Sequence, residues 1–115
     1  MSRNVPPVRV LWWTVSSLIG ARRALKGGET RVDVTPPPSA HEADSRWVRN
    51  AVYRLPFTCL AQSFVYQRWL QAIGDPRDVV VGVTKPSDGF KAHAWVEGDP
   101  SAEGFQEMRR YPPVA

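Results

Sequence analysis

Apolar residues recur every three or four positions in three stretches of the chain, and this spacing predicts three amphipathic helices. The first covers residues 8–26 and ends at two glycines, the second covers residues 41–54, and the third covers residues 58–73 and ends at Gly74. Thr58 is a favourable N-cap for the third helix, whose apolar stripe is the widest. We therefore expect the third helix to lie at the centre of the fold.

Later stretches have the pattern of β-strands. Residues 79–83 form a run of valines interrupted only by Gly82, which predicts a strand covered on both faces. Residues 90–97 alternate and predict a second strand, antiparallel to the first across a turn at residues 85–89. Residues 104–108 predict a short third strand. Together these elements predict an α+β fold with N-terminal helices, in which the third helix packs on a small antiparallel sheet.

The length of 115 residues indicates a single domain. Residues 29–40 contain three consecutive prolines, Pro36 to Pro38, and predict an extended linker. This linker joins the first helix to a core that we expect to span residues 41–115.

Composition and charge exclude several classes of function. The net charge of +4 is mild and the arginines are scattered, so we expect no nucleic-acid partner. The apolar stretch at residues 8–21 is too short to cross a bilayer, so we expect no stable membrane insertion. A single cysteine excludes a disulfide framework and fits the reducing cytoplasm. One cysteine and one nearby histidine leave a zinc site incomplete, and we expect no metal or cofactor.

The candidate chemistry lies at Cys59 and His93. Cys59 falls in the first turn of the third helix, where unpaired N–H groups and the helix dipole favour a thiolate and could bind an oxyanion. His93 falls on the second strand, from which its ring can project toward that helix end. It would take the thiol proton and later protonate a leaving amine. This order of elements is one that thiol hydrolases use.

A third group should orient the imidazole. Glu97 shares a strand face with His93 but lies roughly 13 Å along it, which is too far for a hydrogen bond. A carboxylate on an adjacent strand comes closer, and Glu107 on the third strand is the best placed. Asp99 and Glu103, in the preceding hairpin, are the alternatives.

Non-catalytic explanations exist for each feature. A lone cysteine is usually a small buried hydrophobic residue, and a strand histidine is usually structural. The first helix carries Trp12 and Trp13 side by side, which point to different faces, so it either packs on the core or docks a partner. A binding or scaffold module is therefore a separate hypothesis, and it predicts an unreactive Cys59.

Four segments together resemble a known family. They are residues 55–60 (Leu-Pro-Phe-Thr-Cys-Leu), 72–74 (Ala-Ile-Gly), 81–83 (Val-Gly-Val) and 90–97 (Phe-Lys-Ala-His-Ala-Trp-Val-Glu). In order and spacing they resemble the lasso-peptide leader peptidases, which are small bacterial cysteine proteases of the papain-related, transglutaminase-like type. The resemblance is close over residues 47–97 and loose over the first helix.

The resemblance implies roles for individual residues. Cys59 matches the nucleophile and His93 matches the base. The family places an acidic residue on the strand after the histidine box, usually Asp in an apolar-Asn-Asp segment. Here Phe105, Gln106 and Glu107 occupy that place, so Glu107 stands where the family has Asp.

The resemblance also implies a function and partners. The chain looks like the stand-alone protease half of a split maturation system, which cuts the leader from a ribosomally made lasso precursor. A separate leader-binding protein would present the precursor, and a cyclase would use the freed amine. An acyltransferase of the same fold, joining an amine to a glutamine, would use the same residues and is the enzymatic alternative.

Overall fold

The computed structural model describes residues 7–84, 89 and 91–113. Its helices are α1 (Val8–Lys26), α2 (Ser45–Arg54) and α3 (Cys59–Ala72), with 3-10 turns η1 (Glu42–Asp44) and η3 (Pro100–Ala102), and its strands are β1 (Val79–Val83), β2 (Ala92–Val96) and β3 (Gln106–Tyr111). The three predicted helices are confirmed, although the second begins with a 3-10 turn. Residues 85–88 of the turn predicted at residues 85–89, and the predicted start of the second strand at Phe90, lie outside the described residues.

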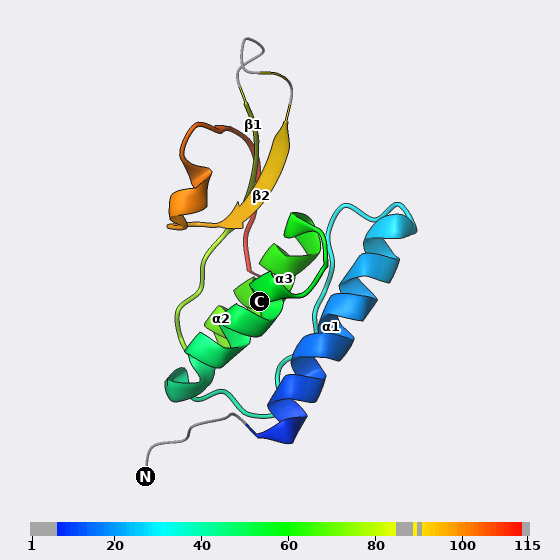
Figure 1. Cartoon of the computed structure of the whole chain (residues 1–115), viewed down its shortest axis with the longest axis vertical. Coiled ribbons are helices and arrows are strands. Elements are labelled where there is room, and N and C mark those ends of the chain that lie inside the picture. Colours follow the sequence, from blue (N-terminus) through cyan, green and yellow to red (C-terminus); the bar gives the residue numbers. More distant parts are fainter. Residues whose placement is uncertain (1–6, 85–88, 90, 114–115) are drawn as a thin grey trace.

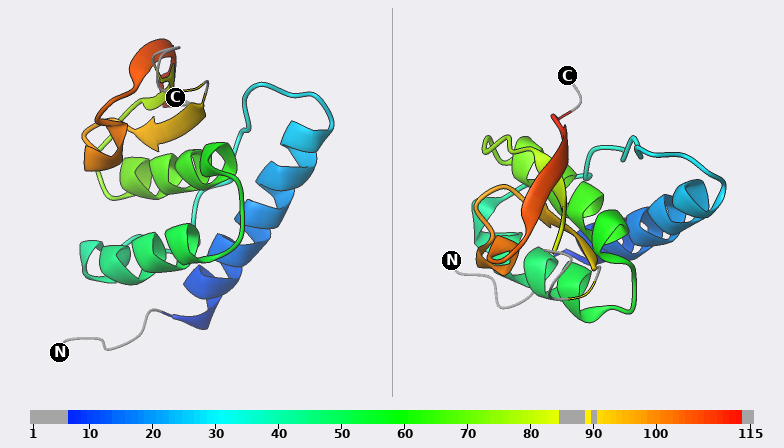
Figure 2. Two further views of the ribbon diagram at one scale, coloured as in Figure 1. Left: turned by 45° about the horizontal axis from the view of Figure 1, so that its top comes forward. Right: turned by 90° about the horizontal axis from the view of Figure 1, so that it is seen from above.

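Helix α3 is the centre of the fold, as its wide apolar stripe predicted. It contacts β1 and β2 on one side and α1 and α2 on the other (Figures 1 and 2). Trp69 of this helix is fully buried, lies 6.1 Å from the ring of Trp13, and donates a 3.0 Å hydrogen bond to Ser45 Oγ. Helices α1 and α2 therefore both pack against α3.

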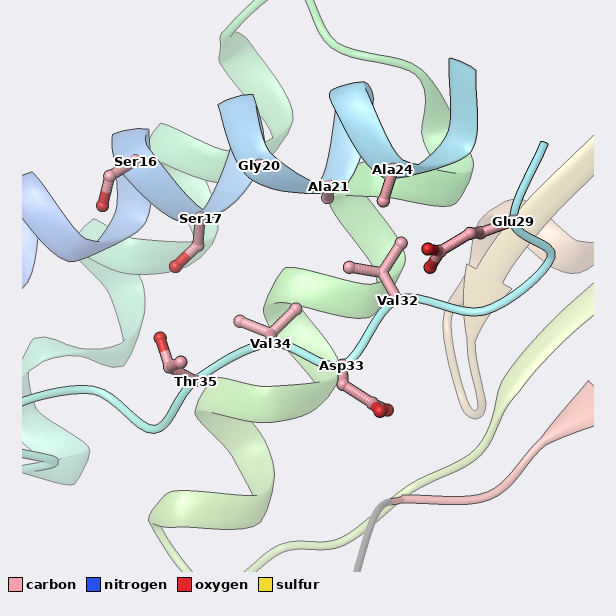
Figure 3. Close-up of a pocket in the computed structure, with 10 residues that line it drawn as sticks. All are labelled: Ser16, Ser17, Gly20, Ala21, Ala24, Glu29, Val32, Asp33, Val34 and Thr35. Carbon is pink, nitrogen blue, oxygen red and sulfur yellow. The ribbon is translucent and has the colours of Figure 1, made fainter. Parts of the chain in front are cut away.

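Residues 29–40, predicted to be an extended linker, contain no helix or strand and pack against the helices (Figure 3). Val32 is buried in the main core, and the Trp13 indole N–H donates a 2.8 Å hydrogen bond to the Thr35 carbonyl. The neighbouring Trp12 is 72% exposed, so the two adjacent tryptophans do point to different environments.

Within the described residues, the sheet is antiparallel with strand order β2-β1-β3. The prediction of a third strand is confirmed, but the strand begins two residues later than residues 104–108 and ends three residues later. It pairs with β1 and not with the histidine-bearing β2. The physical reason is burial: Val79 and Val80 are almost fully buried, and the central place between two strands shields β1 best. The segment after β2 crosses to the far edge through η3.

The sheet has a helix-facing side and an outer side. Val79 and Val96 are register partners and belong to the helical core, where Tyr111 of β3 also packs on Phe64. Alternation places Val80 and Trp95 on the outer side, where Phe105 covers Trp95. Both faces of β1 are thus covered, as predicted from its valines.

Candidate active site

Cys59 is the first residue of α3, and local hydrogen bonds hold it there. Thr58 is the N-cap, and its hydroxyl accepts a 3.3 Å hydrogen bond from the Ala61 N–H. The buried Ser63 hydroxyl donates a 2.7 Å bond to the Cys59 carbonyl. The thiol therefore lies beside N–H groups of the first turn of α3, and these groups have no acceptor within the helix.

The Cys59 thiol lies at the free edge of the sheet. β2 is an edge strand, and the Ala94 N–H donates to Cys59 Sγ at 3.4 Å. Because the Ala94 nitrogen is two covalent bonds from the His93 Cα, the sulfur lies within roughly 6 Å of that Cα. The fold thus brings together two residues that are distant in the sequence, and the thiol is partly exposed.

The His93 ring lies on the outer side of the sheet. It stacks on Trp95 at a centroid distance of 5.7 Å and lies 5.0 Å from the Phe105 ring. The sequence predicted a ring projecting toward the start of α3; alternation along β2 instead directs it away from the face on which α3 packs. The hydrogen bond that the structure gives the ring joins Nε2 to the Ser101 hydroxyl at 3.0 Å.

Among the described residues, no hydrogen bond joins the Cys59 sulfur to the His93 ring. In enzymes without bound substrate, catalytic hydrogen bonds are often long and shorten only when substrate binds. The sulfur nevertheless lies within roughly 6 Å of the His93 Cα, so both residues are held at the β2 edge strand.

Ser101 was not singled out from the sequence. It lies in η3, which begins with Asp99 as N-cap and Pro100 as first residue, and the Asp99 carboxylate accepts a 2.9 Å hydrogen bond from the Ser101 N–H. Asp followed by Pro is a recognisable start of a helical turn. This pattern predicts the turn. It does not predict that the turn lies next to the ring of His93.

Glu107, the acidic residue predicted to orient His93, lies on β3 and not beside the histidine strand. Glu107 shares the register position of Gly82 with His93, so β1 separates it from the histidine strand. Its carboxylate accepts a 2.7 Å bond from Arg110. Glu97, which lies too far along the strand to bond His93, also binds Arg110, at 2.6 Å. The expectation that Glu107 lies beside the histidine strand is corrected by the strand order.

The remaining predicted alternatives differ in their surroundings. Asp99 caps the turn that holds Ser101, whereas Glu103 is exposed. Burial, with the negative charge of Asp99 as a further cause, raises the pKa of the Tyr53 hydroxyl far above its ordinary value of 10.0, so this tyrosine near the turn is neutral.

Arg110 makes the main charged cluster on the sheet. Its guanidinium contacts Asp78, Glu97 and Glu107. Hydrogen bonding by Arg110 holds the pKa of the Glu97 carboxyl below its ordinary value of 4.5. These carboxylates are therefore occupied in a structural ion-pair network and not aimed at the histidine.

Two cavities in the described part of the chain are lined by residues other than Cys59. A cavity of about 380 Å³ lies between α1 and the extended segment, where Ser17 and Ala21 face Val34 and Thr35 (Figure 3). A smaller one of about 120 Å³ is bordered by Asp99 and Pro100, next to Ser101. Across residues 7–84, 89 and 91–113, no group of three metal-ligating side chains gathers, and no helix has the length and apolarity to cross a membrane.

Comparison with known protein families identifies the family of the chain. The model of the Transglutaminase-like superfamily matches residues 5–115. The chain belongs to the transglutaminase-like superfamily. Domains of this superfamily are generally catalytic and resemble cysteine proteases, which accords with the α+β architecture of three helices and a small antiparallel sheet in the described part of the chain. No curated protein and no solved structure matched the chain significantly.

Proposed function

We propose that this transglutaminase-like chain is a cysteine endopeptidase that removes the leader from a ribosomally made lasso-peptide precursor. The observation that carries the proposal is the Cys59 thiol at the start of α3, hydrogen-bonded to the strand that bears His93. The sequence boxes around these two residues, which resemble the leader peptidases, support the same substrate class.

The proposed reaction proceeds through a thioester. The Cys59 thiol proton passes to His93, and the sulfur adds to the carbonyl carbon of the scissile bond. N–H groups in the first turn of α3 stabilise the resulting oxyanion. The C–N bond then breaks, the core peptide leaves as an amine carrying the proton from His93, and the leader stays on sulfur as a thioester. Water activated by His93 hydrolyses this thioester and restores the thiol.

The test is cleavage of the precursor peptide encoded beside the gene, with and without the leader-binding protein, followed by mass spectrometry. We expect one cut, lowered by on the order of 10⁴-fold or more in Cys59→Ala and in His93→Ala. His41→Ala is the matched control, because His41 is the other histidine of the chain and is exposed.

Three results would contradict the proposal. Undiminished cleavage by Cys59→Ala would remove the thioester mechanism. Products that join an amine to glutamine with loss of ammonia, in place of a hydrolysed peptide bond, would favour the acyltransferase. No reaction with either substrate, together with an unreactive Cys59, would favour the scaffold module.

We also propose that α1 docks the leader-binding protein. Val8 and Trp12 are 81% and 72% exposed and lie four residues apart, hence on one face of the helix, with the more weakly exposed Val15 one turn further. Large exposed apolar side chains on one face are typical of interaction sites. Interfaces of this kind depend mainly on a few large aromatic anchors.

The docking proposal is tested by titrating the leader-binding protein against Trp12→Ala. We expect affinity to fall about 10-fold or more while the melting temperature changes little, because the indole is exposed. Met108→Ala is the control, since Met108 is 65% exposed on β3. Equal affinities for Trp12→Ala and the wild type would show that this face binds no such partner.

A further inference from the structure

The His93 imidazole is clamped on three sides by groups from the segment that follows it. Trp95 and Phe105 contact the ring at 5.7 and 5.0 Å between centroids and define its plane. The Ser101 hydroxyl contacts Nε2 at 3.0 Å and defines its rotation within that plane. The N–H of Ser101 is in turn held by Asp99, so the hydroxyl sits on a capped turn.

We infer that Ser101 is the residue that positions His93, in the place where a carboxylate would act in a conventional triad. The inference rests on the proposed function only in taking His93 as the base of Cys59. With Nε2 bound to Ser101, Nδ1 is the nitrogen left to exchange a proton with the thiol. Ser101 acts through the ring and is a positioning residue, not a catalytic one.

A hydroxyl suits this position chemically. It can donate or accept, so it bonds Nε2 whichever tautomer the neutral ring adopts, and it accepts from Nε2–H when the ring is protonated. It brings no charge, so it orients the imidazolium without the stronger stabilisation that a carboxylate gives. The proposed site therefore depends on orientation by packing and one neutral hydrogen bond.

The carboxylates of the sheet do not compete for this role. Glu107 lies across β1 from His93 and is bonded to Arg110, as is Glu97. Asp99 binds the backbone of Ser101, so its contribution to His93 is indirect. Ser101 is the polar side chain that the structure places on the ring.

The test uses the reactivity of the thiol and needs no peptide substrate. Cys59 is the single cysteine, so alkylation by iodoacetamide, followed by mass across a pH range, reports this thiol alone. Proton exchange with His93 should raise the rate near neutral pH, and His93→Ala should remove that increase. Ser101→Ala should lower it about 3- to 10-fold, the effect of losing one neutral hydrogen bond, while Ser101→Thr should restore it.

Ser16→Ala is the matched control, because Ser16 is an exposed serine on α1 that also makes a single hydrogen bond, to the Trp13 carbonyl. In the cleavage assay, Ser101→Ala should lower kcat with little change in KM. The replacement Ser101→Asp should move the pH profile of alkylation toward higher pH, because a carboxylate favours the protonated ring.

Several outcomes would overturn the inference. One is a wild-type alkylation profile in Ser101→Ala when His93→Ala is changed. Another is a loss of the rate increase near neutral pH in Glu107→Gln and not in Ser101→Ala. A third is an alkylation profile of His93→Ala that equals the wild-type profile. An absence of leader cleavage, by contrast, would reject the proposed substrate and leave the alkylation result valid.

Discussion

Replacing Gly82 by alanine tests the packing that supports His93. Gly82 on β1 is the register partner of His93 on β2, and the Trp95 ring lies over Gly82. A Cβ at this position would lie 2.7 Å from the Trp95 Cη2 atom and 2.7 Å from the Gln106 carbonyl oxygen. The ring and a backbone atom of the neighbouring strand would both have to move, and Trp95 is the residue on which the His93 ring stacks.

The magnitude follows from two opposing terms. Overpacking a well-packed site costs about 1–3 kcal/mol. Gly82 has no positive φ, so alanine fits its backbone and should recover about 0.4–1 kcal/mol by restricting the unfolded chain. We expect a net loss of between about 0 and 2.6 kcal/mol in the free energy of unfolding, measured as a lower urea midpoint with an unchanged m value. Thiol reactivity should also fall, because displacement of Trp95 disturbs the ring of His93.

The matched control is Gly20→Ala. Gly20 lies inside α1, and a Cβ there would meet no atom within 4 Å. The same chemical change should therefore stabilise the protein by about 0.5–1 kcal/mol. If Gly82→Ala proved as stable as Gly20→Ala, the close approach of Trp95 to Gly82 would not exist as described. Combining Gly82→Ala with Trp95→Leu should cost less than the sum of the two changes, and strict additivity would refute the contact.

Two further predictions concern the cap and the ion pairs. Thr58→Ala should lower the free energy of unfolding by about 1 kcal/mol, because it removes the hydroxyl that accepts from the Ala61 N–H, whereas Thr58→Ser should keep most of it; equal loss in both would assign the effect to packing. Arg110→Met should destabilise the protein near neutral pH, and the difference from wild type should shrink in acid. Arg110 lowers the pKa of Glu97 from 4.5, so the stabilisation is present above that pH and is lost as pH falls through the lower folded-state value. Urea midpoints at pH 7 and 3 measure this, and a constant difference would exclude Glu97 as the titrating partner.

The helices and the strands could be predicted because their signals are local. The spacing of apolar residues over residues 8–26, the Thr58 cap and the valines of β1 each act within a few positions of the chain. Cys59 and His93 could be selected as candidates for the same reason, since a thiol at a helix start and a histidine in an alternating strand are visible without knowing the fold.

The pairing of β3 was decided only by the tertiary structure. The pattern of residues 104–108 predicts a strand, but no local feature of the sequence indicates which strand it pairs with. Burial of β1 on both faces places it between β2 and β3, and this order moves Glu107 one strand away from His93. The expectation that β3 lies next to the histidine strand is therefore wrong, because β3 pairs with β1.

The sequence by itself determined which elements form and which side chains carry reactive atoms, because hydrophobic spacing, caps and residue chemistry are properties of short segments. Only the tertiary structure decided what surrounds those atoms. The Ala94 N–H on the thiol, the outward direction of the His93 ring and the Ser101 hydroxyl on its Nε2 all arise from contacts across strand edges and a crossing turn. Such contacts depend on strand order and register, which the packing of the whole chain sets.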